Sequence, residues 1–262
     1  VKLFEELDVP VTPSNMSFGA SVDGGRIEYA LRSLDAMFAQ RKNALNPKFL
    51  RMIADILKFN SQGLSVAQDR SLTIGGFLDR LGTGEWFRDY YLLPLSGAIW
   101  STPTEKIMEF PAYAMLQFFE NHALLRSTGQ HQWYTVDGGS REYVSRVEQA
   151  LHKQDVTIRL GAAIEWIKRT ETGLLVKSPG HVPQPFDDVV LATHSDDSLK
   201  MLADPTPAET AALGAIRYQP NDIILHRDET VMPVRKKCWA SWVYTERVDK
   251  VADRIDLTYW MN

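Results

Sequence analysis

The stretch from Asp187 to Asp197 has residue types that suit the binding of a nucleotide. The residues Val189-Val190-Leu191-Ala192 form an uninterrupted apolar run, and Thr193 and His194 follow. Such a run, without polar alternation, predicts a strand that is covered on both faces, as in a parallel sheet. Small residues such as Ala192 and Thr193 at its carboxyl end let a cofactor approach the backbone closely, which is where open α/β sheets bind ligands. An ordinary strand-to-helix turn without a ligand would contain the same residues.

A helix is expected to follow this strand directly. Ser195 can cap its amino terminus, and Asp196 and Asp197 would lie in its first turn, where the helix dipole favours negative charge. The strand prediction has a testable consequence for Val190. If Val189, Val190 and Leu191 are buried between layers, Val190→Asp should prevent folding, because it would place an unpaired charge in the core.

Other kinds of chemistry find less support in the sequence. The histidines are scattered without an HExxH motif or a close pair, so no metal site is expected. Cys238 has no nucleophile signature around it, and Gly-x-Ser-x-Gly is absent. There is no Walker loop, and Gly82-Thr83-Gly84 fails as a dinucleotide fingerprint because Phe87 takes the place of its third glycine.

Composition limits the class of protein. The chain has 262 residues, 44% of them hydrophobic, which is ample for a packed core. The formal charge of -4 is spread along the sequence, which argues against nucleic acid and anionic membranes as main partners. A single cysteine excludes an internal disulfide and fits a reducing compartment. No apolar stretch is long enough for a transmembrane segment, so a cytoplasmic location is expected.

Helical patterns dominate the first half of the chain, and strand patterns the second. Before the helices, Asp23-Gly24-Gly25 predicts a hairpin within 16–29. The helices expected there lie around 34–38, from Pro47 with Asn46 as cap, over 73–81 with Gly82 at the end, over 85–100 and over 110–125. After Trp133 comes one more helix, around 140–151. The expected strands cover 156–160, 163–169, 173–177 and 187–192, and a capping box predicts a helix at Thr206-Pro207-Ala208-Glu209. Three β-rich stretches, 216–227, 238–246 and 255–262, close the chain.

An ordered set of segments in this second half carries a family resemblance. The set comprises Gly138-Gly139-Ser140-Arg141, the strand patterns 156–160 and 163–167, and 186–193. It resembles the middle of the flavin-containing amine oxidases and phytoene-desaturase-type flavoproteins. Short motifs elsewhere, such as 91–94, 98–101, 110–112, 194–196 and 259–262, resemble a bacterial subgroup of NAD/FAD-binding, amine-oxidase-like proteins.

The resemblance implies a fold, a cofactor and a site. The fold would be α/β (mixed α+β), with part of an FAD-binding Rossmann-like domain at 133–203 and a largely helical substrate domain, supplemented by strands, at 1–132 and 204–262. The cofactor would be FAD. In the family a glycine pair opens a helix, a valine backbone lies against the adenine, and a D-x-V-I-x-A strand returns beneath the cofactor. The cofactor-binding residues would then be Gly138, Gly139, Ile164 in place of the valine, Ala192, Thr193 and His194.

The substrate side departs from the amine oxidases. These enzymes place a lysine near the flavin, and Asp222–Arg227 contains none, which puts amine oxidation in doubt. Dehydrogenation of an apolar small molecule would require mainly a dry aromatic pocket, since the flavin itself accepts the hydride. The candidate pocket residues are Trp100, Trp239, Trp242 and Tyr259, and the sequence assigns no catalytic residue.

Three functions are therefore open. The first is an FAD-dependent oxidoreductase, amine-oxidase-like or desaturase-like. The second is a non-catalytic protein that binds a ligand or partner on a flavoprotein scaffold, and the third is a helical interaction module unrelated to flavin.

The ends of the chain add an expectation of their own. The chain starts at Val1 without an initiator methionine and stops within a strand pattern, which suggests an internal fragment of a longer protein. The glycine-rich loop that holds a dinucleotide's pyrophosphate is absent from this sequence, so the chain alone is expected to be inactive and to bind FAD weakly. Uncovered sheet edges would also favour self-association.

Overall fold

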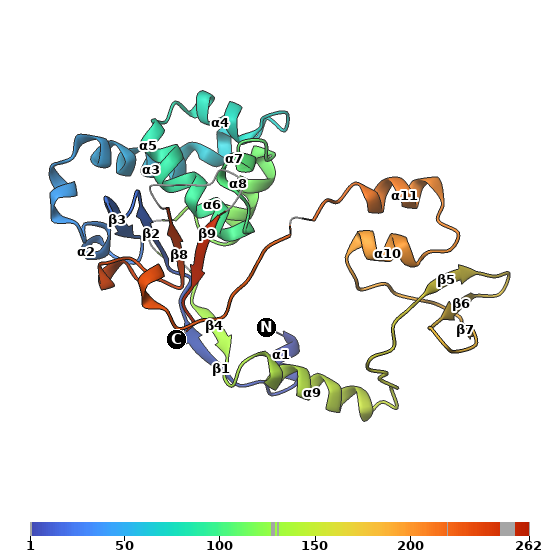
Figure 1. The fold of residues 1–262 in the computed structure, drawn as a ribbon. Coiled ribbons are helices and arrows are strands. Elements are labelled where there is room, and N and C mark those ends of the chain that lie inside the picture. Colours follow the sequence, from blue (N-terminus) through green and yellow to red (C-terminus); the bar gives the residue numbers. More distant parts are fainter. Residues whose placement is uncertain (1, 127–128, 130, 219, 247–254, 262) are drawn as a thin grey trace. The chain divides into compact units, whose positions relative to one another are not determined.

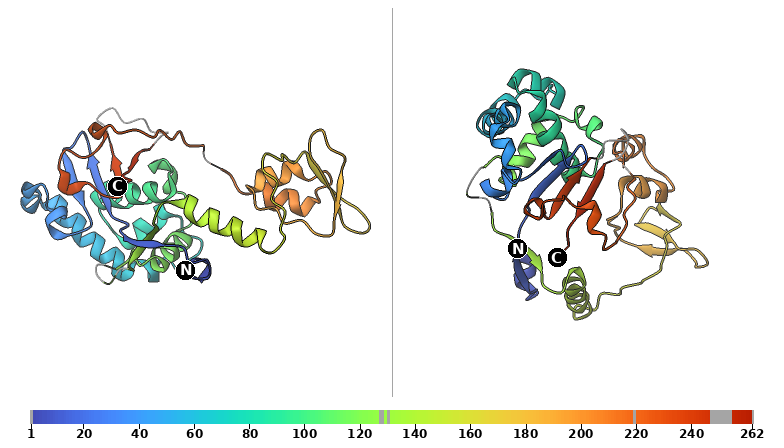
Figure 2. Two further views of the ribbon diagram at one scale, coloured as in Figure 1. Left: turned by 90° about the horizontal axis from the view of Figure 1, so that it is seen from below. Right: turned by 60° about the vertical axis from the view of Figure 1, so that its left-hand side comes forward.

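The computed structural model describes residues 2–126, 129, 131–218, 220–246 and 255–261. The chain forms two compact units, which Figure 1 and Figure 2 trace along the sequence. Unit 1 contains residues 1–143 and 223–262, and unit 2 contains residues 144–222. Both units mix helices and strands, so the chain has the mixed α/β character that the sequence predicts.

A four-stranded sheet of order β3-β2-β8-β9 forms the base of unit 1. The strands are β2 (Phe18–Val22), β3 (Ile27–Ala30), β8 (Trp242–Thr245) and β9 (Asp256–Tyr259). Strands β2 and β3 pair antiparallel across the turn at Asp23, Gly24 and Gly25, all three with positive φ, which confirms the predicted hairpin. Strands β8 and β9 form a second antiparallel pair.

The central pair of this sheet, β2 and β8, is parallel and joins the two ends of the sequence. Phe18 lies opposite Trp242, and Ser21 opposite Thr245. The backbone bonds continue beyond the paired residues, since the Glu246 amide donates to the Ser21 carbonyl at 2.8 Å. Unit 1 is therefore closed by a contact between segments that are more than 200 residues apart in sequence.

Helices cover this sheet, as Figure 1 shows for α3 to α8. They are α2 (Leu34–Met37), α3 (Pro47–Val66), α4 (Ile74–Leu81), α5 (Glu85–Phe87), α6 (Leu93–Trp100), α7 (Thr104–Ile107) and α8 (Ala112–Asn121). Shorter turns lie at η1 (Arg41–Leu45), η3 (Glu229–Val231) and η4 (Lys236–Cys238), and a π-helical turn, η2 (Arg88–Leu92), joins α5 to α6.

The predicted helix signals are present in this layer. The Asn46 side chain accepts hydrogen bonds from the amides of Lys48 and Phe49 at the start of α3, with Pro47 as its first residue. Helix α4 begins at the Thr73 cap and ends at Gly82, whose φ of 67° is the left-handed conformation that favours glycine. The apolar faces of these helices pack around fully buried rings, among them Phe49, Phe59, Phe77, Phe87 and Phe119.

Glu28 is a fully buried carboxylate in β3, and it fastens the segment before β8 to the hairpin. Its Oε1 accepts from the Val234 amide at 2.8 Å and the Ser21 hydroxyl at 3.1 Å. Its Oε2 accepts from the Arg235 guanidinium at 2.7 Å and from the Arg235 amide at 3.3 Å. A charge without access to water requires such partners, because an unpaired buried carboxylate would cost several kcal/mol.

The remaining parts of unit 1 lie outside this sheet. Helix α1 (Lys2–Glu6) precedes a two-stranded antiparallel ribbon of β1 (Val11–Ser14) and β4 (Trp133–Val136). Helix α9 (Ser140–His152) begins in unit 1 and continues into unit 2, and its start agrees with the predicted helix.

Unit 2 contains an antiparallel sheet of order β5-β6-β7 and two helices. The strands are β5 (Trp166–Arg169), β6 (Leu174–Lys177) and β7 (Gln184–Phe186), and the helices are α10 (Ser195–Met201) and α11 (Pro207–Gly214). The predicted capping box is confirmed, because the Thr206 hydroxyl accepts from the Glu209 amide and the Glu209 carboxylate accepts from the Thr206 amide.

The predicted central strand at 187–192 is wrong for this structure. These residues are extended but unpaired, and Val190 is 91% exposed. Val189 and Leu191 turn toward the helices of unit 2 and line a cavity there, so alternate side chains face opposite ways, as in any extended segment. The apolar run is not buried on both sides because, among the described residues, no strand lies beside it.

Two further strand predictions are also wrong. Residues 156–160 form no strand, and neither do the described residues of 216–227. The strand predicted at 163–169 begins only at Trp166, so Ile164 lies outside it. Ser195 is the first residue of α10, and His194 occupies the cap position, without a side-chain hydrogen bond.

The exposure of Val190 reverses the expected effect of its substitution. Val190→Asp should change the free energy of unfolding of unit 2 by less than about 0.5 kcal/mol, as surface substitutions usually do. Ile167→Asp is the matched control: Ile167 is buried in β5, and the charge there should unfold unit 2. Urea denaturation followed by the amide NMR signals of unit 2 measures both variants. If Val190→Asp were as damaging as Ile167→Asp, Val190 would be buried in solution.

Candidate functional site

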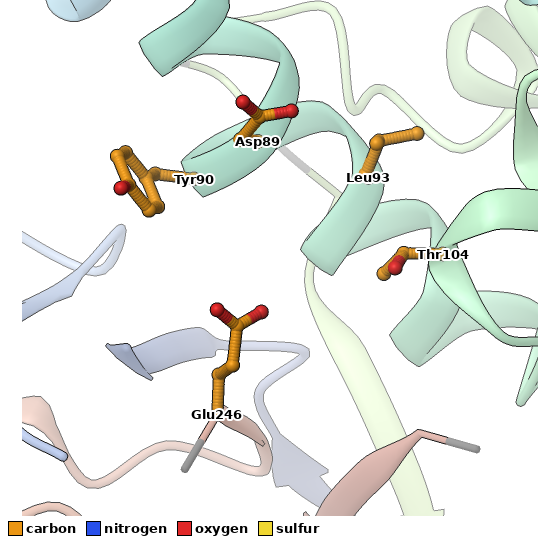
Figure 3. Close-up of a pocket in the computed structure, with 5 residues that line it drawn as sticks. All are labelled: Asp89, Tyr90, Leu93, Thr104 and Glu246. Carbon is orange, nitrogen blue, oxygen red and sulfur yellow. The ribbon is translucent and has the colours of Figure 1, made fainter. Parts of the chain in front are cut away.

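Unit 1 has a cavity of about 240 Å³ between the helices and the end of β8. Asp89, Tyr90, Leu93, Thr104 and Glu246 line it. Figure 3 shows Glu246 extending from the end of β8 toward the helical segment that carries Asp89 and Tyr90. The lining thus combines two acidic residues and two residues with hydroxyls with one apolar residue, and acceptor groups of this kind suit a ligand that donates hydrogen bonds.

The π turn η2 places Asp89 and Tyr90 at the cavity. A π turn holds an extra residue, and in η2 the Leu93 amide donates to the Arg88 carbonyl five residues earlier. Such turns often occur at functional sites. The Tyr90 hydroxyl accepts a hydrogen bond from the Arg26 guanidinium at 3.1 Å, and the Trp86 ring meets the Tyr90 ring edge-on, with centroids 5.0 Å apart.

The carboxylates of Asp89 and Glu246 both accept hydrogen bonds from neighbouring side chains. Arg88 donates to the two Asp89 oxygens at 2.6 and 3.0 Å, which raises the pKa of the guanidinium. The Tyr244 hydroxyl donates to Glu246 at 2.6 Å. Burial, and then this hydrogen bond, raises the pKa of Tyr244, so its hydroxyl remains a donor at physiological pH. The geometry of both carboxylates is thus held by fixed partners.

The four aromatic residues predicted to form the pocket lie in unit 1 but do not line this cavity. Trp242 and Tyr259 are cross-strand partners on β8 and β9, and their rings meet edge-on at 6.3 Å. The Tyr259 hydroxyl lies 2.9 Å from the Ser101 hydroxyl, beside Trp100. Trp239 instead meets Trp260 edge-on at 5.3 Å. Trp242 and Tyr259 are therefore neighbours, the Trp100 ring packs against phenylalanine rings of the helical layer, and Trp239 belongs to a separate pair.

Gly138 and Gly139 form the turn that opens α9. Both have φ of +79°, the left-handed region that glycine adopts without strain. The Gly139 amide donates to the Val136 carbonyl at the end of β4 at 3.1 Å. The glycine pair is thus a local requirement of this turn, whether or not a cofactor lies beside it.

The other predicted cofactor residues lie in unit 2. Ile164 is 37% exposed and precedes β5, and Ala192 and Thr193 are exposed at the end of the unpaired segment. The Thr193 hydroxyl lies 2.7 Å from the Ser198 hydroxyl. The His194 ring stacks on Tyr218, with centroids 4.0 Å apart and planes 7° from parallel.

His194 also belongs to a cluster that the sequence does not single out as a possible metal site. One ligand atom each from His194, Asp196 and Asp197 lies within 4.8 Å of the others. Lys200 is bound to both carboxylates, at 3.4 Å to Asp196 and 2.9 Å to Asp197. The Lys200 ammonium lowers the pKa of Asp197 through this hydrogen bond. A side-chain cation therefore already balances this cluster.

A second cavity, of about 550 Å³, lies within unit 2 between its sheet and its helices. Its wall is mainly apolar and includes Ile167, Leu174, Val189, Leu191, Leu202 and Leu213. The Arg169 guanidinium and the Glu209 carboxylate, which are bound to each other, lie at the same cavity. The cavity thus offers apolar surface and one ion pair.

Sequence reasoning missed all five residues of the cavity in unit 1. Asp89 and Tyr90 belong to the segment 85–100, which is apolar nearly all round, and Asp89 is one of its few charged residues. A charged residue within such an apolar segment is the sequence feature that could have indicated a site. Glu246 could not be connected with it, because the β2–β8 pairing that brings the segments together leaves no local trace in the sequence.

No protein-family model and no curated protein sequence matches the chain. Solved structures do match it. Cyclohexylamine oxidase from Brevibacterium oxydans IH-35A is 14% identical, with a TM-score of 0.55 over 81% of this chain and 48% of that protein. The fold resembles part of the flavin amine oxidase fold. Putrescine oxidase with bound putrescine is 17% identical, with a TM-score of 0.53 over 81% of this chain and 49% of that chain. A cofactor-site double mutant of putrescine oxidase is 18% identical, with a TM-score of 0.54.

The chain spans about half the length of these oxidases. At this level of identity the likeness establishes the fold, which agrees with the family resemblance in the sequence. Within the described ranges, none of the helices combines the length and apolar character that crossing a bilayer would require.

Cys238, at the end of η4, is buried and should be chemically inert. Burial, and then the nearby Glu28 carboxylate, raises the pKa of the Cys238 thiol to about 12. Because the thiolate is the reactive form, the folded protein should resist alkylation by iodoacetamide at pH 8. Mass spectrometry would detect modification only after unfolding in urea, which is the control. Equal rates in the folded and unfolded chain would show that Cys238 is accessible.

Proposed function

We propose that this chain is the substrate-binding part, and a portion of the cofactor-binding part, of an FAD-dependent oxidoreductase. The observation that carries the proposal is the likeness to flavin amine oxidases over 81% of the chain. In this proposal unit 1 binds a small molecule, and residues of unit 2 contact FAD. Bound FAD would accept a hydride from the substrate, which is chemistry that the cofactor itself supplies.

The residues present fit FAD only in part. Ala192 and Thr193 present a small, exposed surface that a planar ring system can approach, and His194 is already stacked on Tyr218. Ile164 would contribute its backbone, as the family resemblance implies. The sequence contains no glycine-rich phosphate loop, and the pyrophosphate needs one. The expectation that the chain alone binds FAD weakly therefore stands as part of the proposal.

The cavity of unit 1 bears on the class of substrate. Arg88 balances the charge of Asp89, but the carboxylate oxygens of Asp89 and Glu246 remain hydrogen-bond acceptors, which suit a substrate with an amino group better than a purely apolar one. The aromatic set around Trp242 and Tyr259 offers the apolar surface that the alternative, dehydrogenation of an apolar substrate, would use. Amine oxidation and apolar dehydrogenation are thus both within the proposal, and the cavity favours the amine.

Flavin content is the first test of the proposal. A longer protein that contains this chain together with a phosphate-binding loop, purified from the cells that make it, should carry flavin with the usual visible absorption bands. Ala192→Trp, which would fill the surface assigned to FAD, should lower the flavin content at least tenfold. Val182→Trp is the matched control, since Val182 is 78% exposed on the β6–β7 turn and should leave the content unchanged.

Bleaching of the bound flavin under anaerobic conditions then tests catalysis, first with short primary amines and second with uncharged apolar alkenes and acyl compounds. Absence of flavin from the purified wild-type protein would contradict the proposal. Bound flavin that no reductant of either class bleaches would instead indicate a non-catalytic scaffold.

A further inference from the structure

Pro94 interrupts the hydrogen bonding of the helical segment that lines the cavity of unit 1. In an α-helix each carbonyl accepts from the amide four residues later, and for Tyr90 that residue is Pro94, which has no N–H. A helix that carries on into α6 at this point therefore cannot satisfy the Tyr90 carbonyl in the ordinary way. The π turn η2 ends at Leu92, two residues before this proline.

A hydroxyl from the sheet reaches this carbonyl instead. The Tyr29 hydroxyl, from β3, donates a hydrogen bond to the Tyr90 carbonyl oxygen. Tyr29 is fully buried, and its ring meets the Phe49 ring edge-on at 6.1 Å, so the direction of its hydroxyl is fixed by packing. Burial raises the pKa of Tyr29 well above its usual value, so the hydroxyl keeps its proton across the physiological range.

We propose that Tyr29 is a positioning residue for this cavity, and that its hydroxyl replaces the amide lacking at Pro94 and thereby holds η2 in the π register that turns Asp89 and Tyr90 toward the cavity. This inference rests on the geometry of unit 1 and is independent of the proposed oxidation. Adding or removing one residue of a helical turn rotates the residues before that turn by about 100° relative to the residues after it. A return to the α register would therefore move Asp89 and Tyr90 relative to Leu93.

The sheet and the helical segment then have different roles at the cavity. Tyr29, from the sheet, determines which side chains of the helical segment face the cavity, and the helical segment provides Asp89 and Tyr90. Glu246 reaches the same cavity from the end of β8, so the residues on both sides of the cavity are positioned by one sheet.

Two phenol-to-phenyl variants test the proposal on the 262-residue chain. Tyr29→Phe should speed amide hydrogen exchange of Leu93 about tenfold and weaken the nuclear Overhauser contact between the Arg26 side chain and the Tyr90 ring. Tyr91→Phe is the matched control, because Tyr91 is equally buried and, within the described ranges, makes no hydrogen bond through its hydroxyl. It should leave both signals as in the wild type.

The double variant Tyr29→Phe with Pro94→Ala tests the mechanism. Residue 94 would regain an amide that can bond the Tyr90 carbonyl in the α register, so Leu93 exchange should return to within about threefold of the wild type, while the contact between Arg26 and the Tyr90 ring should stay weakened. If Tyr29→Phe alone fails to fold, folding of the double variant supports the proposal equally. The proposal is overturned if Tyr29→Phe behaves like Tyr91→Phe, or if Pro94→Ala adds to the loss instead of relieving it. It is also overturned if the double variant fails to fold.

Discussion

The parallel pairing of β2 with β8 is the contact on which unit 1 depends. It joins an amino-terminal hairpin to a strand near the other end of the chain. Nothing in the local sequence of either strand indicates that the two will pair. Bringing such distant segments together carries a large entropic cost, which the contacts made on closure must offset. The buried Glu28 supplies one set of them, since Val234 and Arg235 bind its carboxylate just before the chain enters β8. Loss of these hydrogen bonds would leave the Glu28 carboxylate buried without partners. This costs far more free energy than replacing the carboxylate and its partners with apolar groups.

The cavity follows from the same pairing. Glu246 directly follows β8, and its amide continues the bonds to β2 at Ser21. Tyr29, on β3 at the other side of β2, holds the turn that carries Asp89 and Tyr90. The two carboxylates are therefore positioned by strands of one sheet, although they lie far apart in sequence. A site assembled in this way fits the substrate-binding role proposed for unit 1.

The sequence predicted those parts of the fold whose signals are local. The hairpin at Asp23-Gly24-Gly25, the Asn46 and Thr73 caps, the Gly82 terminus and the capping box at Thr206 depend on a few adjacent residues, and all five are present. The strand at 187–192 failed because an apolar run indicates burial without saying what will bury it. Its prediction as a central strand assumed neighbouring strands, and in the described part of the chain none pairs with it.

The site was harder to predict than the fold for a related reason. Glu28, Asp89 and Glu246 have no shared spacing, and each becomes informative only when the β2–β8 contact is known. The cofactor residues suggested by the family resemblance stay a prediction, because the comparison with solved structures concerns the fold alone.

Native-state hydrogen exchange tests the central claim, that β2 and β8 open as one unit secured by Glu28. The probes are the amides of Trp242 and Glu246, which donate to Ser17 and Ser21, and the amide of Gly24, which donates to the Glu246 carbonyl. The account predicts one common opening free energy for all three, lowered equally in Glu28→Gln. Exchange of Trp242 and Glu246 with a much smaller free energy than that of the β2–β3 hairpin, unaffected by Glu28→Gln, would show that β8 is an independent flap and would contradict the account.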